Sequence, residues 1–251
     1  GLGDVYKRQV TIDVSGRSEV ESSKFEEYRD VVKGVSMPFF RLNGASGAWR
    51  FDFIGENVKQ LDEHYAGSLK TDMFAVSADY NAIIHRIGNQ GRTLLTEVSP
   101  GEWRMSQALQ LAFQNLFEGT PTANRLFPSF IQPLFGPSLA EGTVVDIAVQ
   151  RQRTNVAVDM MRNQPFSVNV TYNREQRHGH GGLSGNNINY IVETPAPTEY
   201  LTQDYGFSAN LTQAWGALRG GFHYNTFDDQ VTALRFDNPL RASDAASATV
   251  T

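Results

Sequence analysis

The feature that most constrains this chain is a strict alternation of apolar and polar side chains over arms of about ten residues. The clearest case lies at 207–225. Its first arm has Phe, Ala and Leu at 207, 209 and 211 with Ser, Asn and Thr between them, and 218–225 repeats the pattern. A two-residue period is that of a β-strand whose two faces differ. Residues 213–216 are predicted to join the two arms as a β-hairpin. Arms of this length can cross a bilayer when the strands are tilted.

The same alternation recurs along the chain, and the lengths of the connections between arms carry further information. Short turns are predicted at 43–47, 69–72, 162–165 and 213–216, and most of the other connections are longer and polar. If 144–160 crosses once, every short turn lies at one end of the strands. Bacterial outer-membrane barrels have this asymmetry, with short periplasmic turns and long outer loops.

Composition excludes several other classes of protein. The mean hydropathy is -0.36, and no apolar run approaches the roughly 18 residues of a transmembrane helix, which excludes a helical membrane protein. Alternating barrel strands look unremarkable on such an average and are not excluded. The absence of Cys rules out disulfides, thiolate metal sites and covalent c-type haem attachment in this chain. The net charge of -5 gives no basic footprint for a nucleic-acid partner.

The predicted fold class is all-β: an antiparallel transmembrane β-barrel segment, arranged as an up-and-down meander of about 9–10 strands of a larger barrel. A soluble β-sandwich could also alternate, but its strands are usually shorter. Tyr and Trp residues near the strand ends fit aromatic girdles at the lipid interfaces; they are Trp49, Tyr172, Tyr200, Tyr205, Trp215 and Tyr224. One long loop, 85–142, breaks the period and contains a predicted amphipathic helix at about 102–117.

The chain is expected to contain one partial barrel domain, at 10–251, and to be a fragment of a longer protein. Residues 1–9 (GLGDVYKRQ) have no apolar core of a signal peptide. They resemble a peptide that recurs at the ends of reading frames assembled from environmental sequence. We therefore expect residues 1–9 to be a non-native assembly artefact.

The polar face of the arms supplies the candidate functional residues, which we expect to face the lumen or a partner. By alternation alone, they are Arg50, Asp52, Ser77, Asp79, Asn169, Thr171, Asn173, Arg219 and His223. The alternative for each is an ordinary solvated residue.

Catalytic, cofactor-binding and metal sites are not predicted. His178 and His180 could chelate a divalent cation, but two His at this spacing lack further ligands. The acidic pairs at 26–27 and 228–229 are expected to point apart or into water. Since the chain has no nucleophile elbow, phosphate loop or zinc helix motif, we expect that it is not an enzyme.

Several segments together carry a family resemblance. They are 24–30 (KFEEYRD), 96–101 (TEVSPG), 172–179 (YNREQRHG), 192–200, 227–229 (FDD) and 236–241 (FDNPLR). In these segments and in their order, the chain resembles the MtrB/PioB family of outer-membrane β-barrels that accompany periplasmic decahaem cytochromes. Some members of that family carry an N-terminal Cys pair, which this chain lacks.

The resemblance implies a structural sheath in the outer membrane of a Gram-negative bacterium. Its barrel surrounds a periplasmic decahaem c-type cytochrome, insulates the haem chain from lipid and so enables extracellular electron transfer. The partners would be this cytochrome in the lumen, outer-membrane lipid and, as a further candidate, an outer-surface multihaem cytochrome. All haem would be carried by the partner and no cofactor by this chain. The alternatives are a general porin or solute-uptake barrel, and a secreted soluble binding module.

Overall fold

The computed structural model describes residues 8–17, 24, 26–30, 34–125, 128–187, 190–238 and 248–250. The chain divides into two compact units, which are treated separately below. Unit 1 comprises Gly1–His85, Gln150–Arg177 and Tyr200–Asp228, and unit 2 comprises Arg86–Val149, His178–Glu199 and Asp229–Thr251. Within the described residues, no helix is long and apolar enough to cross a membrane.

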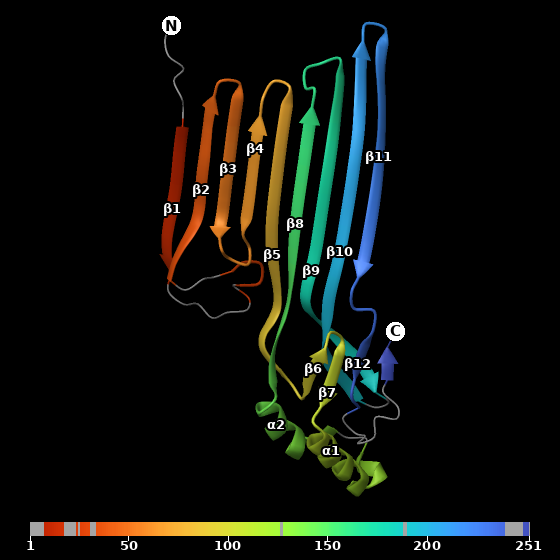
Figure 1. The fold of residues 1–251 in the computed structure, drawn as a ribbon. Coiled ribbons are helices and arrows are strands. Elements are labelled where there is room, and N and C mark those ends of the chain that lie inside the picture. Colours follow the sequence, from red (N-terminus) through yellow and green to blue (C-terminus); the bar gives the residue numbers. More distant parts are fainter. Residues whose placement is uncertain are drawn as a thin grey trace. The chain divides into compact units, whose positions relative to one another are not determined.

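Unit 1 is built on a nine-stranded sheet in which neighbouring strands follow chain order (Figure 1). The strands are β1 (Arg8–Arg17), β2 (Gly34–Ser46), β3 (Trp49–Val58), β4 (His64–Lys70), β5 (Phe74–Thr93), β8 (Thr143–Met160), β9 (Phe166–Asn187), β10 (Tyr190–Gln213) and β11 (Gly216–Asp229). This confirms the predicted all-β antiparallel meander. The strands that are described do not close into a barrel, because β1 and β11 are the two edges of the sheet.

Four short turns lie together at one end of unit 1 (Figure 1). They connect β2 to β3, β4 to β5, β8 to β9 and β10 to β11 at 47–48, 71–73, 161–165 and 214–215. Neighbouring turns are hydrogen-bonded to each other: Arg162 N donates to Met73 O at 3.0 Å, and Thr212 N donates to Pro165 O at 2.7 Å. β8 crosses once, so the predicted clustering of the short turns is confirmed.

The first of these turns is tighter than predicted. The sequence suggested a turn at 43–47, but Asn43 still pairs with Asp52 and the ladder continues to Ser46 opposite Trp49. The reversal needs only two residues because Gly47 adopts φ +57°, a left-handed conformation that glycine reaches without steric cost.

The sheet has one apolar and one polar face. The apolar face carries large side chains that no other described part of the chain covers: Val10, Leu42, Phe51, Leu69, Val170, Phe207 and Phe222 are all exposed, Phe222 at 64%. On this face, the ring of Tyr205 lies between those of Tyr172 and Tyr224. Monomeric soluble proteins rarely expose so continuous an apolar surface to water.

Unit 2 has a small core of its own. Four strands, β6 (Leu95–Ser99), β7 (Glu102–Met105), β12 (Leu234–Phe236) and β13 (Ala248–Val250), form a second sheet in the order β13-β12-β7-β6. Helices α1 (Gln107–Gly119) and α2 (Gln132–Ala140) and the 3-10 turns η1 (Thr122–Asn124) and η2 (Pro128–Phe130) complete the unit. The buried core residues are Leu95, Trp103, Met105, Phe113 and Phe236.

The long loop is more structured than predicted. The helix expected at about 102–117 begins at Gln107, because 102–105 pairs with β6 as a strand and Ser106 Oγ accepts from Leu109 N at 3.3 Å as the helix cap. A second helix, α2, lies in the Pro-containing stretch 128–137, whose composition favours coil. β5 also continues beyond His85 to Thr93, and the polar, Gly-rich segment 174–187, whose composition favours a loop, belongs to β9.

The predicted artefact, residues 1–9, falls mostly outside the described residues. Of it, Arg8 and Gln9 are described, and they pair in β1 with Gly44 and Asn43 of β2. β1 therefore starts two residues before the expected start of the domain at residue 10. The origin of residues 1–9 stays a prediction.

Asp237 joins segments of unit 2 that are far apart in sequence. Its side chain, in a residue only 5% exposed, accepts from Met105 N at 2.8 Å and from Arg104 Nη1 at 3.0 Å. Asp237 N in turn donates to Trp103 O at 3.1 Å. Arg104 also binds Glu102 and, through these hydrogen bonds, lowers the pKa of that carboxyl below its usual value.

Gly55→Ala is expected to destabilise the main sheet. A Cβ at Gly55 would lie 2.0 Å from Phe40 Cε1, so the Phe40 ring would have to leave its edge-on contact with Phe53. Overpacking of this kind costs about 1–3 kcal/mol. The measurement is the urea midpoint of the barrel in lipid vesicles. Gly220→Ala, with nothing within 4 Å of its new Cβ, is the matched control, and equal midpoints would contradict the assignment.

Asp237→Ala is expected to loosen unit 2, because a buried backbone N–H and a guanidinium lose their acceptor. The cost should be about 2–3 kcal/mol. Limited proteolysis should show faster cleavage within unit 2 and unchanged cleavage within unit 1. Asp228→Ala, which removes an exposed carboxylate, serves as the control. Equal cleavage rates in the two variants would show that the Asp237 contacts carry no stability.

Candidate functional site

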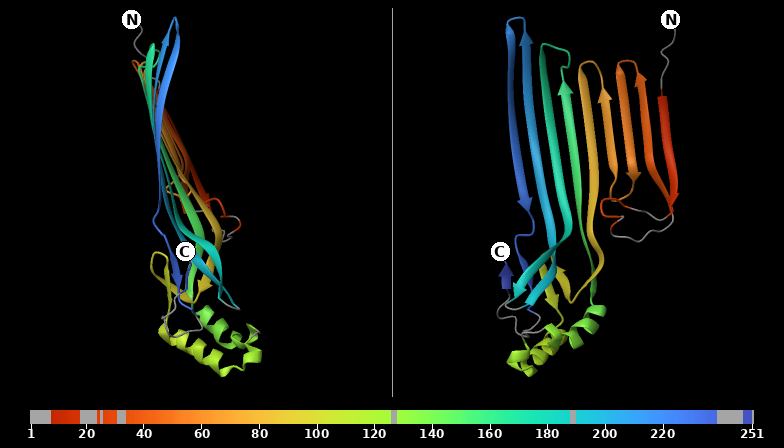
Figure 2. Two further views of the ribbon diagram at one scale, coloured as in Figure 1. Left: turned by 90° about the vertical axis from the view of Figure 1, so that its right-hand side faces the viewer. Right: turned by 180° about the vertical axis from the view of Figure 1, so that it is seen from behind.

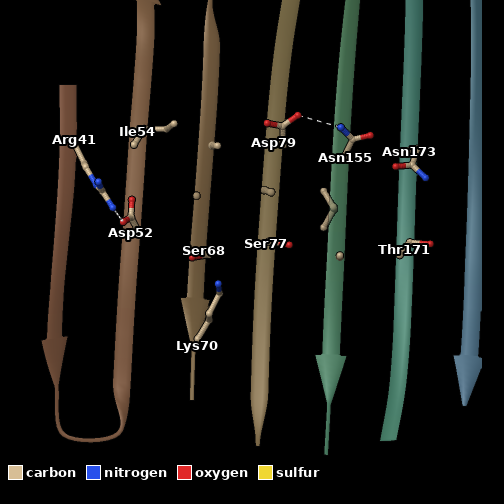
Figure 3. Close-up of a pocket in the computed structure, with 15 residues that line it drawn as sticks. Arg41, Asp52, Ile54, Ser68, Lys70, Ser77, Asp79, Asn155, Thr171 and Asn173 are labelled. Carbon is tan, nitrogen blue, oxygen red and sulfur yellow. Dashed lines mark hydrogen bonds and ion pairs between the residues drawn. The ribbon is translucent and has the colours of Figure 1, made fainter. Parts of the chain in front are cut away.

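The polar face of the main sheet holds a shallow groove that spans β2, β3, β4, β5, β8 and β9 (Figure 3). Its polar lining residues are Arg41, Asp52, Ser68, Lys70, Ser77, Asp79, Asn155, Thr171 and Asn173. These side chains share a face because the paired residues lie directly opposite each other along the ladder, as Asp52, Ser68 and Ser77 do. We call this side of the sheet the polar face.

His64 links three strands on the polar face. Its Nδ1 lies 2.9 Å from Glu56 Oε2 on β3, and its Nε2 lies 2.7 Å from Asp79 Oδ2 on β5. Asn155 on β8 donates from Nδ2 to Asp79 Oδ1 at 3.1 Å. A neutral imidazole donates only one hydrogen bond, so both carboxylates are satisfied when the ring carries both protons. This network ties four neighbouring strands together.

The middle of the polar face is lined by small side chains. Ser68, Ser77, Ala157 and Thr171 lie along it, and a Cβ on Gly206 would meet Thr171 Oγ1 at 2.2 Å. Charged pairs lie to the side: Arg41 forms an ion pair with Asp52 that is substantially exposed. The centre of the polar face is therefore lined by short, uncharged side chains. Such a surface can accommodate a partner or water.

The structure brings five of the nine predicted residues into the one groove: Asp52, Ser77, Asp79, Thr171 and Asn173. Asn169 lies on the same face and donates to Asp159 Oδ1 at 2.7 Å. His223 also lies there, 3.1 Å from the position of a Cβ on Gly206.

The last two predicted residues lie outside the groove. Arg50 on β3 is exposed and lies opposite Lys70 on β4 in the backbone ladder. Arg219 on β11 is also exposed. Contact of any of the nine residues with a partner stays a prediction.

Sequence reasoning missed His64, Glu56, Arg41 and Asn155. The polar composition of 56–63 favours a connection between strands, although β3 continues to Val58. The parity of Ala66 and Ser68 along β4 was the signal that places His64 on the polar face. Asn155 follows a change in the phase of alternation along 145–160, which predicts a bulge or turn near 151–154; the segment belongs to the single strand β8.

Possible metal ligands have other partners in the structure. Within the described ranges, no group of three or more His, Asp or Glu side chains is arranged to hold a metal ion. His180 lies in β9 and not in a loop, and its Nε2 is 3.0 Å from Glu97 Oε2. Of the acidic pairs, Glu27 binds Lys24 at 2.6 Å and Asp229 accepts from Val231 N at 3.1 Å.

The segments that carry the family resemblance build much of unit 2. Glu97 accepts from Gly101 N at 3.2 Å as well as contacting His180, and Gly101 O accepts from Arg235 N at 2.7 Å. Gly101 has φ +80°, and a Cβ there would lie 2.4 Å from Ala233 O. These residues therefore have structural roles in shaping unit 2.

Other parts of the resemblance lie in unit 1. In the 24–30 segment, Tyr28 stacks on His85 with ring centroids 4.6 Å apart, and Asp30 Oδ2 accepts from Leu61 N at 3.0 Å. These contacts fold the segment back onto unit 1. Residues 25 and 239–241 of the quoted segments lie outside the described residues.

Comparison with known proteins agrees with this architecture. A search of curated proteins found no match. The family model described as "Putative outer membrane beta-barrel porin, MtrB/PioB" matches residues 17–251. The match covers nearly the whole chain, including both units and all the segments of the resemblance. This chain belongs to the MtrB/PioB family of outer-membrane β-barrel porins.

Proposed function

We propose that this chain is a structural part of an outer-membrane barrel that sheathes a periplasmic multihaem c-type cytochrome and so enables electron transfer across the outer membrane. In this role the chain catalyses no reaction and carries no cofactor. The observation that carries the proposal is the two-faced sheet, with an uncovered apolar face and a hydrophilic opposite face.

The height of the apolar face fits a bilayer. Along β11, the stretch 216–224 rises about 30 Å, which is about 23 Å along the membrane normal at a strand tilt of about 40°. Leu218, Phe222 and Tyr224 point to the apolar side of this stretch and are all exposed. The apolar band of outer-membrane barrels is about 25 Å tall and is flanked by aromatic residues. The tyrosine row formed by Tyr172, Tyr205 and Tyr224 is placed as such a girdle requires.

The polar face supports a protein occupant of the lumen. Its small central residues would let a partner approach the polar face closely, and some of its charged groups pair with each other, as His64 does with Asp79 and Arg41 with Asp52. Haem attachment needs Cys-x-x-Cys-His, and the chain has no Cys, so any electron carrier would belong to the partner.

A general porin or solute-uptake barrel is the second candidate, because the family description names a porin and a hydrophilic wall also suits a water-filled channel. The two candidates differ in what the lumen holds.

Phe207→Lys should test the membrane assignment. A lysine on the lipid face near the middle of a barrel strand costs about 2–4 kcal/mol. Ser208→Lys places the same charge on the neighbouring polar-face position, and its cost should be below about 1 kcal/mol. Urea unfolding in lipid vesicles measures both. Similar losses of unfolding free energy in the two variants would show that both faces of the sheet meet the same solvent.

Affinity purification should test the sheath. A tagged barrel isolated in mild detergent from its own bacterium is expected to retain a haem-staining polypeptide at constant stoichiometry. A porin would instead arrive without haem and conduct ions steadily in planar bilayers. Absence of any haem-staining band, together with steady conductance, would refute the sheath and favour the porin.

A further inference from the structure

Three arginines gather on the polar face of β8 and β9, away from the groove described above. Asn155 and Ala157 of β8 line the polar face, so Arg151 and Arg153 share it by the two-residue period. On β9, Arg177 lies on the polar face by the same parity from Thr171 and Asn173.

The pairing of the two strands places these arginines side by side. Asn169 Nδ2 donates to Asp159 Oδ1 at 2.7 Å near the turn that joins the two strands. Counted from this contact, Arg151 lies close to Arg177, and Arg153 close to Glu175, on one face of the sheet. Like charges this close on one face destabilise a sheet unless an anion lies nearby.

Among the described residues, Glu175 is the carboxylate that contacts this group. Arg177 donates from Nε to Glu175 Oε1 at 2.9 Å and forms an ion pair with it through Nη2 at 2.8 Å. Arg151 Nε is buried from solvent and has no hydrogen-bond partner. Within the described residues, no ion pair joins Arg151 to a carboxylate. The local charge is positive even though the whole chain is net acidic.

Exposed aromatic side chains lie beside the arginines on the same face. Glu175, Arg177, Tyr200, Thr202 and Phe227 line a hollow of about 440 Å³. The rings of Tyr200 and Phe227 are 5.8 Å apart, and Phe227 is 64% exposed. Tyr200 therefore belongs to the polar face and not to the girdle predicted from the sequence.

Exposed aromatic residues next to Arg are characteristic of the anchor points of protein–protein interfaces, where both residue types are enriched. A path for small anions has no need of an exposed Phe. The composition of this surface thus favours a protein occupant over a free solute.

We propose that Arg151, Arg153, Arg177, Tyr200 and Phe227 form a docking patch for surface carboxylates of the protein that fills the lumen. The guanidinium fork matches a carboxylate with two parallel hydrogen bonds, and the aromatic pair packs against the partner beside it. This inference rests on the proposed sheath function. It adds the position of the contact on the wall and the chemistry that the partner presents there.

The test is salt elution of the haem-containing partner from the immobilised barrel. The double variant Arg151→Gln, Arg153→Gln should release haem at lower NaCl concentration, with an apparent affinity about tenfold weaker, because two charge-assisted hydrogen-bonding groups are lost. The matched control is Arg174→Gln. Arg174 lies on β9 with its side chain on the opposite face, where it donates to Gln176 Oε1 at 2.7 Å, so its elution should match the wild type.

A reciprocal variant sharpens the test. Glu175→Gln frees Arg177 from its internal partner and should raise the NaCl concentration needed for elution. Unchanged heat-modifiable migration in gels will show that each variant still forms a barrel.

Three results would overturn the docking patch. Elution of the double variant at the wild-type salt concentration would refute it while leaving the sheath intact. A changed anion selectivity in planar bilayers, with unchanged haem elution, would assign the arginines to solute passage. A wild-type barrel that retains no haem would refute both the sheath and the patch.

Discussion

The architecture depends on one constraint. Each strand must hydrogen-bond its backbone N–H and C=O groups to the neighbouring strands while presenting different side chains to the two faces of the sheet. In a hydrocarbon environment, an unpaired N–H or C=O costs several kcal/mol because no water can replace the partner. The main sheet meets this constraint through continuous antiparallel ladders, such as the pairing of β2 with β3 from Met37 to Ser46. Once the ladder is fixed, the two-residue period decides which side chains meet lipid and which meet the interior.

The two units solve the problem of stability differently. Unit 1 exposes its largest apolar residues and has few buried side chains. It is therefore stabilised by hydrogen bonds between its strands and by contact of its apolar face with lipid. Unit 2 buries Trp103 and Phe113 in a compact core, both at 2% exposure, as a water-soluble domain does. Asp237 connects its distant segments through backbone and side-chain contacts. A chain of this kind thus carries a lipid-facing sheet and a conventionally packed unit side by side in sequence.

The extent to which sequence predicted this structure follows from the range of each interaction. Local alternation decides whether a segment is a strand and which of its side chains share a face. On that basis Asp52, Ser77 and Thr171 were placed correctly on one face. The start of α1 was misplaced because Met105 fits a helical spacing equally well. Only its pairing with Leu95 on β6, a contact between separate segments, makes it part of a strand. Long strands through 174–187 were missed because Gly and His residues resemble a loop when cross-strand partners are unknown.

The docking patch was hidden from the sequence for the same reason. Arg151 and Arg177 are distant in the chain and become neighbours only through the register of β8 and β9. Tyr200 and Phe227 resembled girdle residues or were unassigned until the structure placed them beside Glu175. The features with the most specific chemistry are therefore those that depend most on register, which alternation alone does not reveal.

The hydrogen bonds between neighbouring short turns have a geometric consequence for the interior. In a barrel, the stagger of each strand relative to the next adds up around the circumference, and together with the strand number it determines the radius and tilt. Arg162 N bonded to Met73 O and Thr212 N bonded to Pro165 O fix this stagger between adjacent hairpins, since sliding by one step would break both. A few main-chain contacts at one end of the strands thus help to set the width of the barrel.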